Sequence, residues 1–68
     1  MAKKIRQLKS MLRKVGFVMR SGKGSHTVWS HPDLHDVVVL SGQDGDDAKP
    51  YQEKDVNSVL SKLEDRHE

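Results

Sequence analysis

The sequence predicts an α+β fold in which an α-helix, three antiparallel β-strands and a second α-helix follow one another, with both helices on one face of the sheet. Apolar residues recur at helical spacing near both ends, and β-branched and aromatic residues fill three short segments between them, separated by glycine- or proline-containing turns. At 68 residues, we expect the chain (1–68) to form one domain with a small core.

The first expected element is an amphipathic helix over residues 3–15. Gly16 follows it directly, and glycine just beyond the last turn commonly ends a helix because it accepts a left-handed backbone. The apolar residues repeat at intervals of three and four, which places them on one side of the helix. These residues are Ile5, Leu8, Leu12 and Val15.

Three strands are expected between the helices. Residues 17–20 form the first, residues 25–31 the second and residues 36–40 the third. The segment 21–24 makes the first turn and the segment 32–35 the second, since both are rich in turn-forming residues. The result is an antiparallel sheet.

Alternation along the second strand predicts where its first histidine points. If Trp29 anchors the core, Thr27 and His31 share its face and His26 points the other way. In the expected layout no helix covers that other face. We therefore expect His26 on the open face, beside the turn that carries Lys23 and within reach of the first helix.

The last element is a helix over residues 51–65, preceded by a glycine- and aspartate-rich loop at 41–50. Pro50 suits the start of a helix, where its missing N–H is tolerated. The apolar stripe that we expect to face the core consists of Val56, Val59, Leu60 and Leu63.

Charge is divided between the two halves of the chain. Residues 1–32 contain eight lysine and arginine residues and no acidic residue, whereas residues 33–68 contain ten acidic and four basic residues. A basic helix is compatible with a solvated surface, but the absence of acids beside it favours binding of a polyanion such as RNA. The candidate phosphate contacts on this helix are Lys9, Arg13 and Lys14.

Composition excludes several classes of site. The chain has no cysteine, which rules out disulfides, thiolate zinc sites and cysteine nucleophiles. The spacing of His26, His31 and His35 does not suit zinc, so no metal or other cofactor is expected. The charged amino terminus does not resemble a signal peptide and no segment has transmembrane length, so we expect a cytoplasmic protein without membrane contact.

Several motifs together resemble the HicA family of bacterial toxins. The resemblance covers most of the chain and implies a fold like that of double-stranded-RNA-binding domains, metal-independent cleavage of messenger RNA, and a HicB-type antitoxin as partner. It also places His26 at the family's catalytic position. The matching features are the basic first helix, Gly16-Phe17, Lys23-Gly24-Ser25-His26, Trp29, His31-Pro32-Asp33 and Lys49-Pro50.

RNA cleavage without a metal needs a base for the 2′-hydroxyl, positive charge at the phosphate and an acid for the leaving 5′-oxygen. Histidine suits the first role. Lys23, assisted by main-chain N–H groups of Gly22 and Gly24, suits the second, and Ser25 can orient the phosphate. The acid is not assigned: water, a lysine or His26 of a second copy in a homodimer all remain open.

Two features depart from the family pattern. Many relatives have a cation two residues before the motif's lysine, where this chain has Ser21, with Arg20 one place earlier as a candidate RNA contact. The loop 43–47 is acidic, and its carboxylates would repel RNA if they lay near the site. Two alternatives therefore stay open: a non-catalytic RNA-binding module, and a protein-interaction domain that uses the acidic half.

Overall fold

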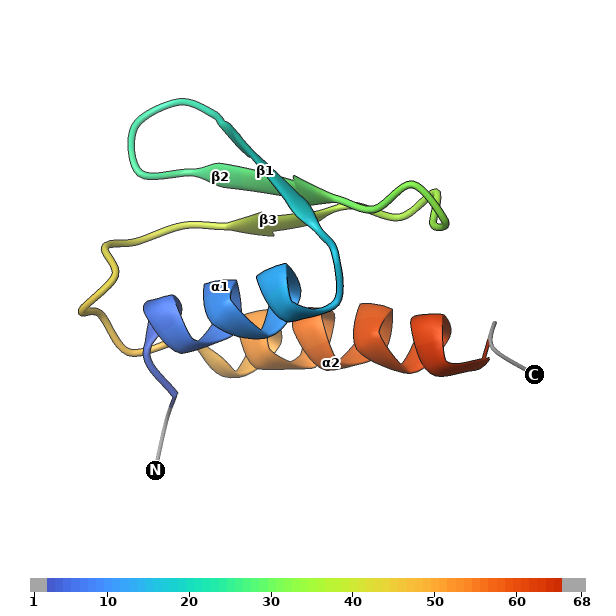
Figure 1. Cartoon of the computed structure of the whole chain (residues 1–68). Helices are drawn as coiled ribbons and strands as arrows, with labels where there is room; N and C mark the ends of the chain where they lie inside the picture. Colours follow the sequence, from blue (N-terminus) through green and yellow to red (C-terminus); the bar gives the residue numbers. More distant parts are fainter. Residues whose placement is uncertain (1–2, 66–68) are drawn as a thin grey trace.

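The computed structural model describes residues 3–65 and confirms the expected α+β fold (Figure 1). The strands form one antiparallel sheet in the order β1-β2-β3. Both helices lie on the same side of this sheet (Figure 1). Among the described residues, no helix is long and apolar enough to cross a membrane. The elements are α1 (Ile5–Lys14), β1 (Val18–Ser21), β2 (Thr27–Ser30), β3 (Val38–Leu40) and α2 (Pro50–Asp65).

Most elements are shorter than expected. β2 begins at Thr27 instead of residue 25, because Lys23 to His26 form a tight turn in which the His26 N–H donates to the Lys23 carbonyl at 3.0 Å. β3 begins at Val38 instead of residue 36. His26 therefore lies in the turn just before the strand, where strand alternation alone does not fix the direction of its side chain.

Gly16 ends α1 as expected, through a Schellman motif. The glycine has a φ of 100°. Its N–H donates to the Arg13 carbonyl at 3.1 Å, and the Phe17 N–H donates to the Leu12 carbonyl at 3.1 Å. These two bonds satisfy carbonyl groups that the last helical turn would otherwise leave without partners. The motif turns the chain directly from α1 into β1.

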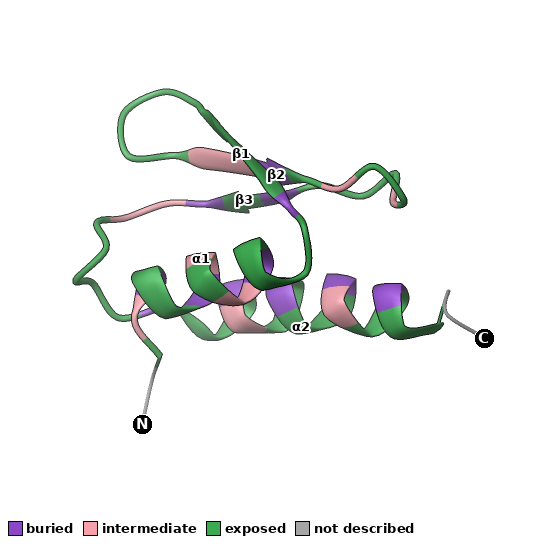
Figure 2. Ribbon diagram, in the orientation of Figure 1, coloured by how far each residue is buried: buried purple, intermediate pink, exposed green. Residues whose placement is uncertain are grey.

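The core lies between the sheet and the helices, and the buried residues of both helices face the sheet (Figure 2). Trp29 is fully buried at its centre, which confirms the face assigned to it. Its indole N–H donates to the Thr27 hydroxyl at 2.9 Å, and the Arg13 guanidinium lies 5.2 Å from the ring centroid. The other buried apolar residues are Ile5, Leu8, Leu12, Phe17, Val38, Leu40, Ala48, Val56, Val59 and Leu63.

Neither α1 nor α2 covers the opposite face of the sheet (Figure 1). Arg20, Val28 and Val39 pair directly across the three strands, so their side chains share this face. Val18, two residues before Arg20, lies on it too, and both Val18 and Val39 are exposed. The open face therefore carries valines and the guanidinium of Arg20.

Replacing Thr27 tests whether its hydroxyl stabilises the buried side chain of Trp29. In Thr27→Val the indole N–H loses its acceptor inside the core, which we expect to lower the free energy of unfolding by about 1–3 kcal/mol. Thr27→Ser keeps a hydroxyl and is expected to stay within about 1 kcal/mol of wild type. Urea denaturation followed by Trp29 fluorescence measures both, and equal stabilities of the two variants would contradict this role.

Candidate active site

The turn between β1 and β2 fixes the backbone of His26. Two main-chain hydrogen bonds close this turn. The Gly22 N–H donates to the His26 carbonyl at 2.9 Å, and the His26 N–H donates to the Lys23 carbonyl. Gly24 has a φ of 58°, which residues with a Cβ rarely adopt. Because the Gly22 N–H is already bonded within the turn, it is not free for the phosphate contact expected from the sequence.

The side chain of His26 is held in one tautomer. Its Nδ1 lies 3.0 Å from the Lys23 carbonyl oxygen. A carbonyl oxygen only accepts hydrogen bonds, so Nδ1 carries the proton and the neutral ring keeps a lone pair on Nε2. The residue is exposed to solvent. His26 thus presents an imidazole nitrogen able to accept a proton from a bound molecule.

His26 lines an open pocket at one end of the sheet, with a volume of about 320 Å³. Figure 1 shows that the β1–β2 loop, the β3–α2 loop and the start of α1 all lie at this end. Lys9 of α1 lines this pocket together with residues of both loops. We call it the His26 pocket; its lining residues are Lys9, Ser21, Gly24, Ser25, His26, Thr27, Gly42, Gln43 and Asp44.

Lys9 brings positive charge into this pocket, and it is paired. Its Nζ lies 2.6 Å from Oδ1 of Asp44 in the β3–α2 loop, which comprises residues 41–49. The hydrogen bond from Lys9 and its charge lower the pKa of Asp44 below the ordinary carboxyl value, with smaller contributions from Arg13 and Arg6. Asp44 is therefore an ionised carboxylate beside the cation that we expected to bind phosphate.

Ser25 also lies in the His26 pocket, where it connects two loops. Its Oγ accepts the Gly42 N–H at 3.1 Å, and Gly42 has a φ of 106°. The Ser25 hydroxyl hydrogen is not used by this bond, so it can still donate to an anion. The serine that we expected to orient a phosphate therefore also holds the β3–α2 loop against the β1–β2 turn.

Gly24 also lines the His26 pocket, whereas the other candidate cations do not. Arg13 covers Trp29, and Arg20 is on the open face of the sheet. Lys14 is exposed at the end of α1, and Lys23 contributes its carbonyl oxygen to the turn. The structure thus brings together His26, Ser25 and Lys9 and leaves the remaining cations distributed around them.

The acidic loop lies against the basic helix, a contact that sequence reasoning missed. The Ile5 N–H donates to the Asp46 carbonyl at 2.9 Å and the Arg6 N–H to the Asp44 carbonyl at 3.1 Å. These bonds cap the amino terminus of α1, whose first turn contains no acidic residue. Lys4 pairs with Asp47 at 2.6 Å. Sequence spacing predicts contacts between residues that are close in the chain, so it could not predict these pairs.

His31 differs from His26 because both of its ring nitrogens are engaged. Nε2 donates to the Val15 carbonyl at 2.9 Å, and Nδ1 accepts the Asp33 N–H at 3.0 Å. The ring also meets Phe17 edge-on, with centroids 5.1 Å apart. His31 thus connects the end of α1 to the turn after β2, and its nitrogens have no free position for proton transfer.

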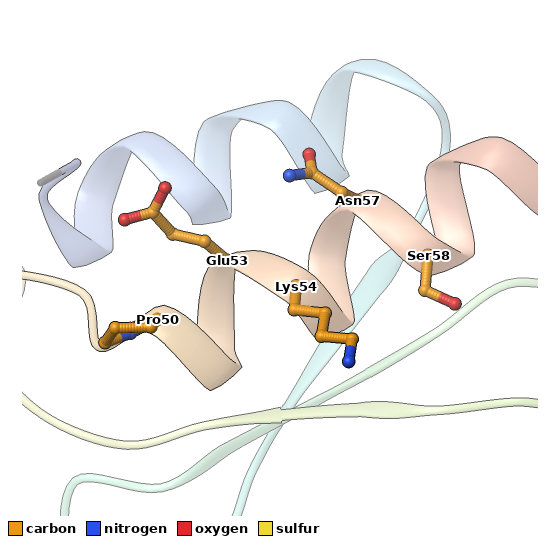
Figure 3. Close-up of a pocket in the computed structure, with 5 residues that line it drawn as sticks. All are labelled: Pro50, Glu53, Lys54, Asn57 and Ser58. Carbon is orange, nitrogen blue, oxygen red and sulfur yellow. The ribbon is translucent and has the colours of Figure 1, made fainter.

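Other surfaces offer less to a reaction. A depression of about 620 Å³ lies on α2, and all of its lining residues belong to that one helix (Figure 3). Among residues 3–65, no three histidine, aspartate or glutamate side chains gather as a possible metal-ligand set. The residues of the α2 depression are Pro50, Glu53, Lys54, Asn57 and Ser58.

Comparison with known proteins gives one match. The model of the HicA toxin family, which describes a toxin of bacterial toxin-antitoxin systems, matches residues 5–64. This range runs from the first residue of α1 almost to the end of α2 and includes the His26 pocket. No curated protein and no solved structure matches the chain.

Replacing each of the two histidines by alanine should show which of them stabilises the fold. His31→Ala leaves the Asp33 N–H and the Val15 carbonyl without partners and is expected to lower the free energy of unfolding by about 1–3 kcal/mol. His26→Ala removes an exposed ring and is expected to change it by less than about 1 kcal/mol. Chemical denaturation of both variants tests this, and a larger loss in His26→Ala would contradict it.

Proposed function

Because the chain belongs to the HicA toxin family of bacterial toxin-antitoxin systems, we propose that it is a toxin that cleaves messenger RNA and uses His26 as general base. The observation that best supports this proposal is the orientation of the imidazole. The Lys23 carbonyl holds Nδ1–H, and the exposed ring keeps Nε2 as a proton acceptor beside the His26 pocket. A base for a ribose hydroxyl requires this tautomer and this access.

In the proposed reaction, Nε2 of His26 takes the proton of a 2′-hydroxyl while that oxygen attacks the adjacent phosphorus. The bond from phosphorus to the 5′-oxygen of the next nucleotide breaks, which gives a 2′,3′-cyclic phosphate and a free 5′-hydroxyl. The leaving oxygen takes its proton from water, from a lysine or from His26 of a second copy. The imidazolium formed on His26 keeps its Nδ1–H bonded to the Lys23 carbonyl, so the ring does not have to turn during the reaction.

Positive charge and a hydroxyl are available for the phosphate. Lys9 lines the pocket, and Lys23 is exposed in the turn that carries His26. The Ser25 hydroxyl can donate to a phosphate oxygen while its Oγ accepts the Gly42 N–H. Cations and donors placed before the reaction stabilise the charge that develops on the phosphate oxygens. Arg13, Lys14 and Arg20 would contact the RNA backbone farther from the site.

We also propose that a HicB-type antitoxin is the partner of this chain, in keeping with its family. An antitoxin that covers the His26 pocket would block access of RNA to Nε2 without changing the fold. The pocket is open and its histidine exposed, so a partner can reach it.

Cleavage of a labelled messenger RNA tests the role of His26. We expect His26→Ala to lower the cleavage rate by about 10²–10⁴-fold, the usual contribution of a general base, and to stay folded. Wild-type cleavage should persist with EDTA and should give a 2′,3′-cyclic phosphate end. Salt-sensitive RNA binding with no cleavage by the wild type would indicate a non-catalytic RNA-binding module, and neither binding nor cleavage would indicate a protein-interaction domain.

Expression in bacteria tests the toxin role. Wild-type protein is expected to arrest growth because it removes messenger RNA, and His26→Ala is expected to relieve the arrest at equal protein levels. Colony counts after induction measure both. Unimpaired growth with the wild-type protein would contradict the proposal.

A further inference from the structure

The ion pair between Lys9 and Asp44 forms part of the lining of the His26 pocket. We propose that Asp44 is a resident counter-ion of Lys9, which an RNA phosphate displaces on binding, so that Asp44 weakens the affinity for RNA. This inference rests on the proposed function, since it concerns how the same pocket takes its substrate. It assigns a role to a residue of the acidic loop.

The exposure of the two side chains supports displacement. The Lys9 side chain is only 14% exposed, whereas that of Asp44 is 64% exposed. The stem of Lys9 is thus held in place by packing, and its ammonium group can pair with either a carboxylate or a phosphate. The carboxylate, in contrast, can turn into solvent at little cost, because exposed ion pairs contribute little to stability.

The main chain of Asp44 does not need to move for this exchange. Its carbonyl accepts the Arg6 N–H at the amino terminus of α1, and the Gln43 N–H donates to Oδ2 of Asp46 at 2.9 Å. The Gly42 N–H is bonded to Ser25. Since the loop is held on both sides of Asp44, only the aspartate side chain has to rotate for Lys9 to become available.

The chain contains a matched control for this residue. Asp47 lies in the same loop and pairs at the same 2.6 Å with Lys4, the residue just before α1, and its side chain is 65% exposed. Asp47 does not line the His26 pocket, whereas Asp44 does. Asp44→Asn and Asp47→Asn thus remove equal charge from ion pairs of equal length, and they differ in position relative to the pocket and in the exposure of the lysine, which is 41% for Lys4.

Binding of a fluorescein-labelled single-stranded RNA, measured by anisotropy in His26→Ala protein so that the RNA stays intact, tests the proposal. We expect Asp44→Asn to tighten binding by about three- to tenfold at low salt. The slope of log affinity against log salt should change by less than about 0.7, the value for one phosphate contact, because Lys9 meets the phosphate in both proteins. Asp47→Asn should tighten binding by less than about twofold because salt screens a more distant charge.

A second background separates release of Lys9 from direct repulsion of RNA by Asp44. With Lys9→Met present, no cation remains to be released, so Asp44→Asn should change affinity by less than about twofold. In protein that retains His26, Asp44→Asn should raise cleavage at low RNA concentration by the same factor as binding. The rate at saturating RNA should stay unchanged, because the counter-ion affects only substrate binding.

Three results would overturn the counter-ion role while leaving the nuclease in place: equal effects of Asp44→Asn and Asp47→Asn, an undiminished effect in the Lys9→Met background, or weaker binding in Asp44→Asn with wild-type cleavage intact. The last result would mean that Asp44 positions Lys9 for the phosphate. Failure of the wild type to bind or cut RNA would instead reject the proposed function, and this inference with it.

Discussion

The burial of Trp29 between the sheet and α1 is the constraint on which the rest of this small structure depends. The ring is too large to be exposed without loss of most of the core, and its N–H requires an acceptor, which Thr27 supplies at the first position of β2. This hydrogen bond fixes which side chains of β2 point into the core, from Trp29 back to Thr27, the first residue of the strand. The next residue back along the chain is His26, so the turn that carries the proposed base begins where the core ends.

The opposed charges of the two halves meet in the folded chain. The β3–α2 loop supplies main-chain carbonyls to the first N–H groups of α1 and carboxylates to Lys4 and Lys9. A basic helix without acidic residues in its first turn gains stabilisation of its positive end in this way. The loop that sequence reasoning treated as a possible obstacle to RNA binding is therefore also part of the framework of α1. Of the two loop carboxylates that pair with lysines, Asp44 lines the pocket and Asp47 does not.

The two histidines of the central segment show how environment separates roles within one residue type. His31 uses both nitrogens to join the end of α1 to the turn after β2, and it packs on Phe17. His26 uses one nitrogen to fix its own turn and leaves the other for a ligand. A histidine whose two nitrogens are bonded to main-chain groups stabilises the fold, whereas one with a single fixed nitrogen retains the capacity for proton transfer.

The sequence alone determined the order of the elements, the termination of α1 at Gly16, the burial of Trp29 and the candidacy of His26, because periodicity, turn chemistry and a family resemblance are properties of neighbouring residues. It could not place His26 on a face of the sheet, since β2 begins one residue later and strand alternation does not extend into a turn. It also could not pair Lys9 with Asp44 or bond His31 to Val15. Those contacts join residues far apart in the chain, and only the packing of α1 against the sheet and the β3–α2 loop brings them within hydrogen-bonding distance.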